Sequence, residues 1–287
     1  MENKWWLIED EETLHKARIS NNYKKKVLLQ KKLYIFDQDG TTYLDFKPLP
    51  GAREIVAYLM KKSKSYVVFI SNNSSKSTYT YQKKLSSILD ISISENQIYT
   101  STLATIQYLK LNGINSVYAV GTPDFEKELM NHGIELTEEN PELVIVAFDT
   151  TLTYEKLKKA CLFIRNGIEY VATHPDKVCP TQEGYIPDTG SFIALIETAT
   201  DVKPKKILGK PNPDLINFLL DKFNLSPSDA IIFGDRLYTD ILMGKNSNIT
   251  TALMLTGESK IKDIERYGII PDFVFINFEE VLQLLRS

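Results

Sequence analysis

The segment KLYIFDQDGTT, residues 32–42, decides the fold that we expect for this chain. An apolar run, residues 33–36, ends abruptly in acids, which is typical of a buried strand that delivers carboxylates into a turn. Alternate residues of an extended segment point the same way, so Asp37 and Asp39 can converge on one point. Close like charges repel unless a proton or a cation lies between them. Because Mg2+ prefers oxygen ligands, the pair predicts a magnesium site.

The same residues also fit two simpler structures. Asp and Gly are common turn formers, so residues 37–40 are compatible with a turn that binds nothing. An EF-hand calcium loop fits less well, because a strand precedes the acids and the closing Glu is not at the required spacing. The rest of the chain has to distinguish the turn from the metal site.

Composition limits the classes of protein that the chain can represent. Its 287 residues favour two domains, or a core with an insertion. The net charge is -3, so the chain lacks the basic surplus of nucleic-acid-binding proteins. We find no secretory signal pattern and no apolar stretch of transmembrane length, and therefore expect no membrane partner. Cys161 and Cys179 follow no metal-ligand spacing, which favours reduced thiols in a cytoplasmic protein.

A second strand with a polar end follows the first. Residues 52–62 have the apolar spacing of a helix, and the apolar run 66–70 stops at the polar residues 71–75. Strand, helix and strand in this order form a crossover with parallel strands, so both polar ends fall on one edge of the sheet, where ligands bind. Ser71 and Asn72 can therefore bind an anion there, or they can cap the next helix.

The block 78–206 contains enough strands and helices for an inserted α/β domain. We expect strands at 115–121, 142–149 and 169–173, and helices at 123–131, 154–166 and 191–199. A long loop rich in Pro, Asp and Gly follows the last strand, and such loops are usually functional or disordered. The predicted domains are thus a core of 32–77 and 207–287, the insertion 78–206, and an amino-terminal extension, 1–31, that carries Trp5 and Trp6.

Two later segments bring further charged residues to loops. In ILGKPNP, residues 207–213, the prolines favour a helix start, and Lys210 before it is either a solvated charge or a functional cation. In AIIFGDRLYTD, residues 230–240, a buried strand again stops at an acid, Asp235, and Asp240 follows in the turn. One such ending fits a helix cap, but two endings, each with a second acid, favour a shared site.

In order, these four segments resemble the motifs of the haloacid dehalogenase superfamily: an Asp-x-Asp-Gly turn, a strand-ending Ser, a Lys and a late acidic pair. Residues 234–241, together with 48–52 and 71–74, are similar to the subfamily IIA phosphatases of the NagD and 4-nitrophenylphosphatase type. Residues 148–157 resemble a recurring segment of their C2 cap. The resemblance runs from Leu33 to the carboxyl terminus, and implies a Rossmann-like, doubly wound parallel sheet with an inserted α/β cap.

The resemblance implies a magnesium-dependent phosphatase that acts on a small phosphorylated metabolite. Asp37 would be the nucleophile that forms an aspartyl-phosphate, and Asp39 would act as general acid and then as general base. Mg2+ would be held by Asp37, the backbone carbonyl of Asp39 and Asp235, with Asp240 ordering these ligands.

The phosphate group would be bound by residues of the second and third motifs. Ser71, the Asn72 amide and Lys210 are the donors that the resemblance implies. Thr41 would be a further residue of the phosphate site, and its hydroxyl would form a hydrogen bond with Asp39 and so orient it.

The cap loop contains further candidates for substrate contact. His174 stands where relatives commonly carry Asn, and a lone histidine at a strand end is more often structural than a ligand. Asp188 and Gly190 are further candidates for contact with the substrate.

Two other functions stay open: phosphate transfer to an acceptor other than water, and phosphometabolite binding without catalysis. Because caps of relatives often pair, a homodimer is one assembly to test.

Overall fold

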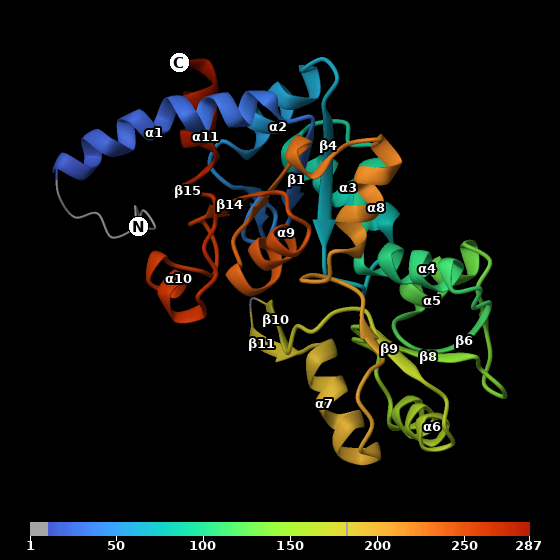
Figure 1. Cartoon of the computed structure of the whole chain (residues 1–287). Helices are drawn as coiled ribbons and strands as arrows, with labels where there is room; N and C mark the ends of the chain where they lie inside the picture. Colours follow the sequence, from blue (N-terminus) through green and yellow to red (C-terminus); the bar gives the residue numbers. More distant parts are fainter. Residues whose placement is uncertain (1–10, 182) are drawn as a thin grey trace. The chain divides into compact units, whose positions relative to one another are not determined.

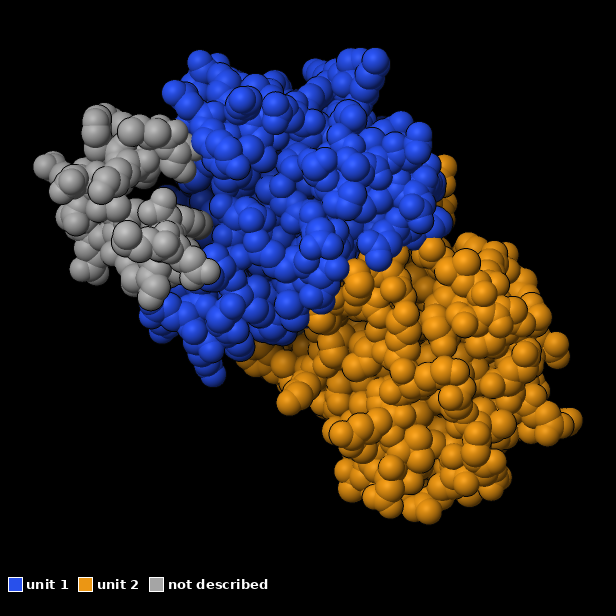
Figure 2. All heavy atoms as spheres, in the orientation of Figure 1, with its two compact units in different colours: residues 1–69, 85–92, 216–287 blue, residues 70–84, 93–215 orange. Residues whose placement is uncertain are grey.

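The computed structural model describes residues 11–181 and 183–287, which divide into two compact units (Figures 1 and 2). Unit 1 takes in the described residues up to Phe69, together with Leu85–Ser92 and Ile216–Ser287. Unit 2 takes in Ile70–Lys84 and Ile93–Leu215. The predicted domain boundaries do not coincide with these limits, and they stay a prediction.

The larger sheet contains the strand that ends at Asp37. Its order is β15-β14-β13-β1-β4-β5. The strands are β1 (Leu33–Asp37), β4 (Tyr66–Ser71), β5 (Ile98–Thr100), β13 (Ala230–Gly234), β14 (Thr250–Met254) and β15 (Phe273–Phe275). β13 pairs in parallel with both β1 and β14. The expected α/β fold with a parallel sheet is confirmed, and Asp37 and Gly234 end neighbouring strands.

Aromatic side chains hold β1 in the core of unit 1. The Phe36 ring lies 5.1 Å from that of Phe233, 5.7 Å from that of Phe69 and 5.4 Å from that of Phe278, measured between ring centroids. All five residues of β1 are buried, which explains the continuous apolar run before Asp37.

Several further elements lie outside the larger sheet and the second sheet described below. They include α1 (Glu11–Gln30), β2 (Tyr43–Leu44), β3 (Lys47–Pro48), α2 (Ala52–Lys61), α3 (Thr78–Leu89), η1 (Glu95–Gln97), α8 (Asp214–Phe223), η2 (Pro227–Asp229), η3 (Leu237–Ile241), α9 (Leu242–Asn246), α10 (Ile261–Tyr267) and α11 (Phe278–Arg286).

Within the amino-terminal extension, residues 11–30 form α1, which packs against α11 (Figure 1). The Lys62 ammonium donates hydrogen bonds to the carbonyls of Leu29, at 2.6 Å, and Lys31, at 2.8 Å. A cation at the carboxyl end of a helix satisfies its free carbonyls and its dipole. The second half of α1 is therefore fastened to unit 1, whereas Trp5 and Trp6 lie outside the described residues.

Unit 2 is built on a second parallel sheet with a core on each face. The order β12-β9-β8-β6-β7 comprises β6 (Ser116–Val120), β7 (Glu135–Leu136), β8 (Leu143–Val146), β9 (Tyr170–Ala172) and β12 (Lys206–Ile207). Ile145 belongs to one buried apolar cluster, and its neighbours Val144 and Val146 belong to another. Because alternate strand residues point to opposite faces, both faces are covered. The helices of this unit are α4 (Ser101–Leu111), α5 (Pro123–Asn131), α6 (Tyr154–Arg165) and α7 (Thr189–Thr200).

The prediction of a long loop after β9 was wrong in one respect. It contains an antiparallel hairpin, β10 (Val178–Thr181) and β11 (Gly184–Pro187). Each of these strands includes a proline, Pro180 or Pro187. A proline within a segment of sequence is a signal against predicting a strand there. A two-stranded ribbon consists of edge strands only, so it tolerates residues without an N–H donor.

None of the helices within the described ranges combines the length and the apolar composition that crossing a membrane requires.

Candidate active site

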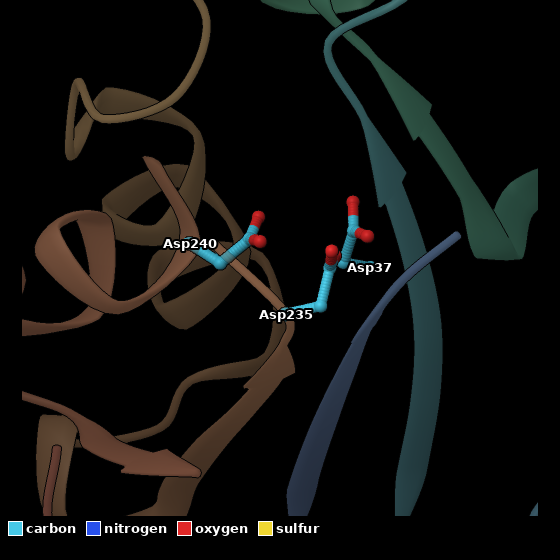
Figure 3. A group of neighbouring side chains, drawn as sticks. All are labelled: Asp37, Asp235 and Asp240. Atoms are coloured by element: carbon cyan, nitrogen blue, oxygen red, sulfur yellow. The ribbon is translucent and has the colours of Figure 1, made fainter. Parts of the chain in front are cut away.

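Three aspartates from two neighbouring strand ends meet in unit 1. Asp37 is the last residue of β1, Asp235 follows β13, and Asp240 lies in η3. One carboxylate oxygen of each lies within 4.8 Å of those of the other two, and all three residues are buried. Figure 3 shows the three carboxylates gathered at one point. The structure thus brings together the acids of the first and fourth motifs.

The carboxylate of Asp235 is enclosed on several sides. Its Oδ1 accepts a hydrogen bond of 3.1 Å from the Thr41 hydroxyl, and its Oδ2 accepts one of 2.8 Å from the Glu258 amide. A Cβ on Gly257 would lie 2.0 Å from Oδ2, and one on Gly40 would lie 2.7 Å from it. Only glycine fits these two positions, and Gly40 also has φ +86.

Burial and repulsion raise the pKa of Asp235 to about 7. Burial is the largest cause, and the negative charges of Asp37 and Asp240 add to it. The hydrogen bond from the Glu258 amide opposes the rise. A cation among the three carboxylates would relieve the repulsion. Three hard oxygen donors in a buried, negatively charged position therefore fit Mg2+.

The side chain of Asp39 lies outside this cluster and is exposed. Its Oδ2 accepts a hydrogen bond of 3.2 Å from the Tyr43 hydroxyl. The Thr41 hydroxyl donates a hydrogen bond to Asp235, a partner that the sequence did not predict. The reason is the tight turn at Gly40: the amides of residues 41–43 all donate to the Gln38 carbonyl, and this directs Thr41 inward. Nothing in the sequence had indicated Tyr43.

Two of the predicted phosphate-binding residues, Asn72 and Lys210, are bonded to each other in unit 2. The Asn72 Oδ1 accepts a hydrogen bond of 2.8 Å from the Lys210 amide, and the Asn72 Nδ2 donates one of 3.2 Å to the Lys210 carbonyl. Ser71 is buried, and its Oγ accepts from the Asn73 amide at 3.1 Å. The second and third motifs are thus joined through a side chain to which the sequence analysis had given no separate role.

The three cap residues proposed as substrate contacts also lie together. The ring of His174 is buried, with Nε2 3.5 Å from Asp188 Oδ1. The Gly190 amide donates a hydrogen bond of 2.8 Å to the Asp176 carbonyl. The Thr189 hydroxyl, 3.0 Å from His174 Nε2, completes the group. The sequence had suggested the helix start at Thr189 as a contact, but it gave no role to Asp176, whose partner Asn72 lies in a distant segment.

Sequence comparison identifies the family on both sides of the insertion. The profile described as haloacid dehalogenase-like hydrolase matches residues 34–135, and one described as HAD-hydrolase-like matches residues 207–281. A protein of Staphylococcus saprophyticus named acid sugar phosphatase is 30% identical over 258 residues, which are 89% of this chain and 98% of that protein.

Comparison with solved structures indicates the same family. The 4-nitrophenylphosphatase of Thermotoga maritima has a TM-score of 0.86 and 43% identity, covering 90% of this chain and 99% of that one. NagD of Escherichia coli K-12 has a TM-score of 0.80 and 30% identity, covering 87% and 98%. The chain therefore belongs to the haloacid dehalogenase-like hydrolases, in the group that contains NagD and the 4-nitrophenylphosphatases.

Proposed function

We propose that this protein is a magnesium-dependent phosphatase that hydrolyses a small phosphomonoester through an aspartyl-phosphate on Asp37. The observation that carries the proposal is the buried meeting of Asp37, Asp235 and Asp240. The printed names of its relatives, acid sugar phosphatase and 4-nitrophenylphosphatase, support the reaction class. They also make sugar phosphates the first substrates to examine.

In the first step, a carboxylate oxygen of Asp37 attacks phosphorus while the bond to the ester oxygen breaks. The leaving oxygen takes a proton from Asp39. The carboxyl group of Asp39 is exposed and can reach a substrate, and the Tyr43 hydroxyl, 3.2 Å from both Asp39 Oδ2 and Gln38 Oε1, is a hydrogen-bond partner for it. In the second step, water attacks phosphorus and gives its proton to Asp39. Phosphate leaves, and the carboxylate of Asp37 is restored.

Asp37, the Asp39 carbonyl and Asp235 are the groups that would hold Mg2+. When bound, the ion neutralises charge on the carboxylates and on the transferred phosphoryl group. Asp235 is oriented for this by the Thr41 hydroxyl and the Glu258 amide. Asp240 is fixed by the Arg236 amide, which donates a hydrogen bond of 3.1 Å to its Oδ2.

In this proposal, the phosphate group is bound by Ser71, the Asn72 amide and Lys210. Phosphoryl transfer depends mainly on positioning and on neutralising the equatorial oxygens, so donors on a fixed backbone are effective. The two hydrogen bonds between the Asn72 side chain and the Lys210 backbone provide such fixing.

The test is hydrolysis of 4-nitrophenyl phosphate by the purified protein with Mg2+. Asp37→Asn is expected to abolish hydrolysis while the thermal unfolding temperature stays near that of the wild type. Asp45→Asn is the matched control, because Asp45 is an exposed acid in the turn between β2 and β3. Retained hydrolysis in Asp37→Asn would refute the nucleophile assignment.

The same assay separates hydrolysis from phosphate transfer to another acceptor. Released nitrophenol and released phosphate are expected in equal amounts, with and without an added alcohol or sugar. A deficit of phosphate in the presence of the acceptor would identify a phosphotransferase. Binding of phosphate with no release of nitrophenol would identify a protein that does not catalyse the reaction.

A further inference from the structure

We propose that His174 is a positioning residue that holds Asp176, and through it Asn72 and Lys210, in the arrangement that binds phosphate. The inference rests on the proposed function, since it concerns the same phosphate-binding groups. It replaces direct substrate contact as the role of His174.

His174 bridges two acids from separate segments of unit 2. It follows β9, and its buried Nδ1 makes no hydrogen bond but lies at ion-pair distance, 3.5 Å, from Asp176 Oδ2. Its Nε2 lies 3.5 Å from Oδ1 of Asp188, the residue that caps α7, and 3.0 Å from the Thr189 hydroxyl. The residue is 0% exposed, so no part of its surface is left for a substrate.

The Oδ2 of Asp176 connects His174 to the second motif. This oxygen faces His174 Nδ1, and it also accepts a hydrogen bond of 3.1 Å from Asn72 Nδ2. The same Nδ2 donates to the Lys210 carbonyl, and the Asn72 Oδ1 accepts from the Lys210 amide. A rotation of Asp176 therefore removes one of the contacts that hold the Asn72 amide, and with it the Lys210 backbone.

Tight packing prevents these groups from adjusting independently. A Cβ on Gly209 would lie 2.6 Å from Asn72 Oδ1, 2.6 Å from the Thr173 carbonyl and 3.1 Å from the His174 Cβ. The Gly209 amide also donates a hydrogen bond of 2.6 Å to that carbonyl. The end of β9 and the loop that carries Lys210 are thus in direct contact, so a shift at one is passed to the other.

The imidazole ring suits this position because it has a nitrogen on the side of each acid. An Asn side chain, by comparison, has a single nitrogen donor. Burial raises the pKa of Asp188, and the neighbouring His174 opposes that rise. A buried carboxylate without such a partner is unfavourable, and would turn toward another donor.

The experiment measures the dissociation constant of inorganic phosphate by titration calorimetry in the presence of Mg2+. His174→Ala is expected to weaken phosphate binding by about tenfold, a typical coupling between contacting residues. His132→Ala is the matched control, because His132 is an exposed histidine of the same unit, and it is expected to leave the constant unchanged. If His174→Ala does not fold, His174→Asn is measured against the same criteria.

A double-mutant cycle distinguishes positioning from general stabilisation. In an Asn72→Ala background, removal of His174 is expected to weaken phosphate binding no further, although it still lowers the unfolding temperature. An equal loss of affinity in both backgrounds, or no loss in either, would overturn the inference. Because calorimetry needs no turnover, failure of wild-type hydrolysis would contradict the proposed function and leave this comparison intact.

Discussion

The hydroxyl of Thr41 donates a hydrogen bond of 3.1 Å to Oδ1 of Asp235, which lies 194 positions away in the sequence. It ties the turn after β1 to the end of β13, where the three buried aspartates meet. Gly40 and Gly257 approach the Asp235 carboxylate so closely that a Cβ on either would collide with Oδ2. The orientation of a proposed metal ligand is therefore set by residues outside the acidic cluster.

Removal of this hydrogen bond tests its importance for the metal. Thr41→Val keeps the shape of the side chain, and is expected to weaken Mg2+ binding by about tenfold, as loss of a group that orients a ligand commonly does. Thr102→Val is the matched control, since Thr102 is also buried and its hydroxyl has no hydrogen-bond partner. The measurement is the Mg2+ dependence of kcat/KM, and equal dependence in the two variants would contradict the role of Thr41.

The raised pKa of Asp235 predicts an unusual pH dependence of stability without metal. In the unfolded chain the carboxyl group titrates near 3.8, and in the folded protein near 7. Between these values the folded state binds more protons than the unfolded state, so stability falls as the pH rises, and the loss is complete above the folded pKa. With a chelator present, we expect the unfolding temperature to decrease between about pH 4 and about pH 7 and to level off above that.

Two comparisons assign this pH dependence to the site. Asp235→Asn is expected to flatten the chelator profile, because the group that titrates is gone. Mg2+ is expected to raise the unfolding temperature of the wild type most at the alkaline end, where all three carboxylates are charged. Parallel profiles for the wild type and Asp235→Asn in scanning calorimetry would disprove the assignment.

The fastening of α1 predicts that the extension contributes to stability. Lys62→Met removes the donor for the Leu29 and Lys31 carbonyls and for the Tyr34 hydroxyl, at 2.6, 2.8 and 2.5 Å. The expected cost is about 1–3 kcal/mol in the free energy of unfolding, measured with urea. Lys61→Met, at the exposed neighbouring position, should have little effect. Neither variant is expected to change kcat, and an unaltered stability in Lys62→Met would argue against the fastening.

Crowding at Gly209 predicts a loss of activity from a single methyl group. In Gly209→Ala the new Cβ would lie 2.6 Å from Asn72 Oδ1, so either the Asn72 side chain or the backbone around Lys210 has to move. Displacement of a binding group by ~1 Å can cost about 100-fold in rate. Gly113→Ala is the control for the kinetics: its Cβ would meet no atom within 4 Å, and because Gly113 has φ +66 the change is expected to lower stability without moving a neighbouring side chain. Kinetics with 4-nitrophenyl phosphate would contradict this prediction if both variants matched the wild type.

The sequence by itself determined the parts of this protein that depend on local order. The apolar run of β1 and its abrupt end at Asp37 predicted a buried strand, and the same pattern predicted β13 before Asp235. Parallel strands end at one edge of their sheet, so these acids were expected to meet. Helix α5 was predicted with its bounds, Pro123–Asn131, because its periodicity and its initial proline are local signals.

Only the tertiary structure decided the contacts between segments far apart in the chain. The partner of Thr41, the position of Tyr43 beside Asp39, and the bridge from His174 to Asp176 and Asn72 leave no trace in spacing. The pKa of Asp235 likewise depends on burial and on charges brought from another strand. A side chain's hydrogen-bond partners and its local electric field are set by what folding places around it, and the order of residues along the chain does not record these neighbours.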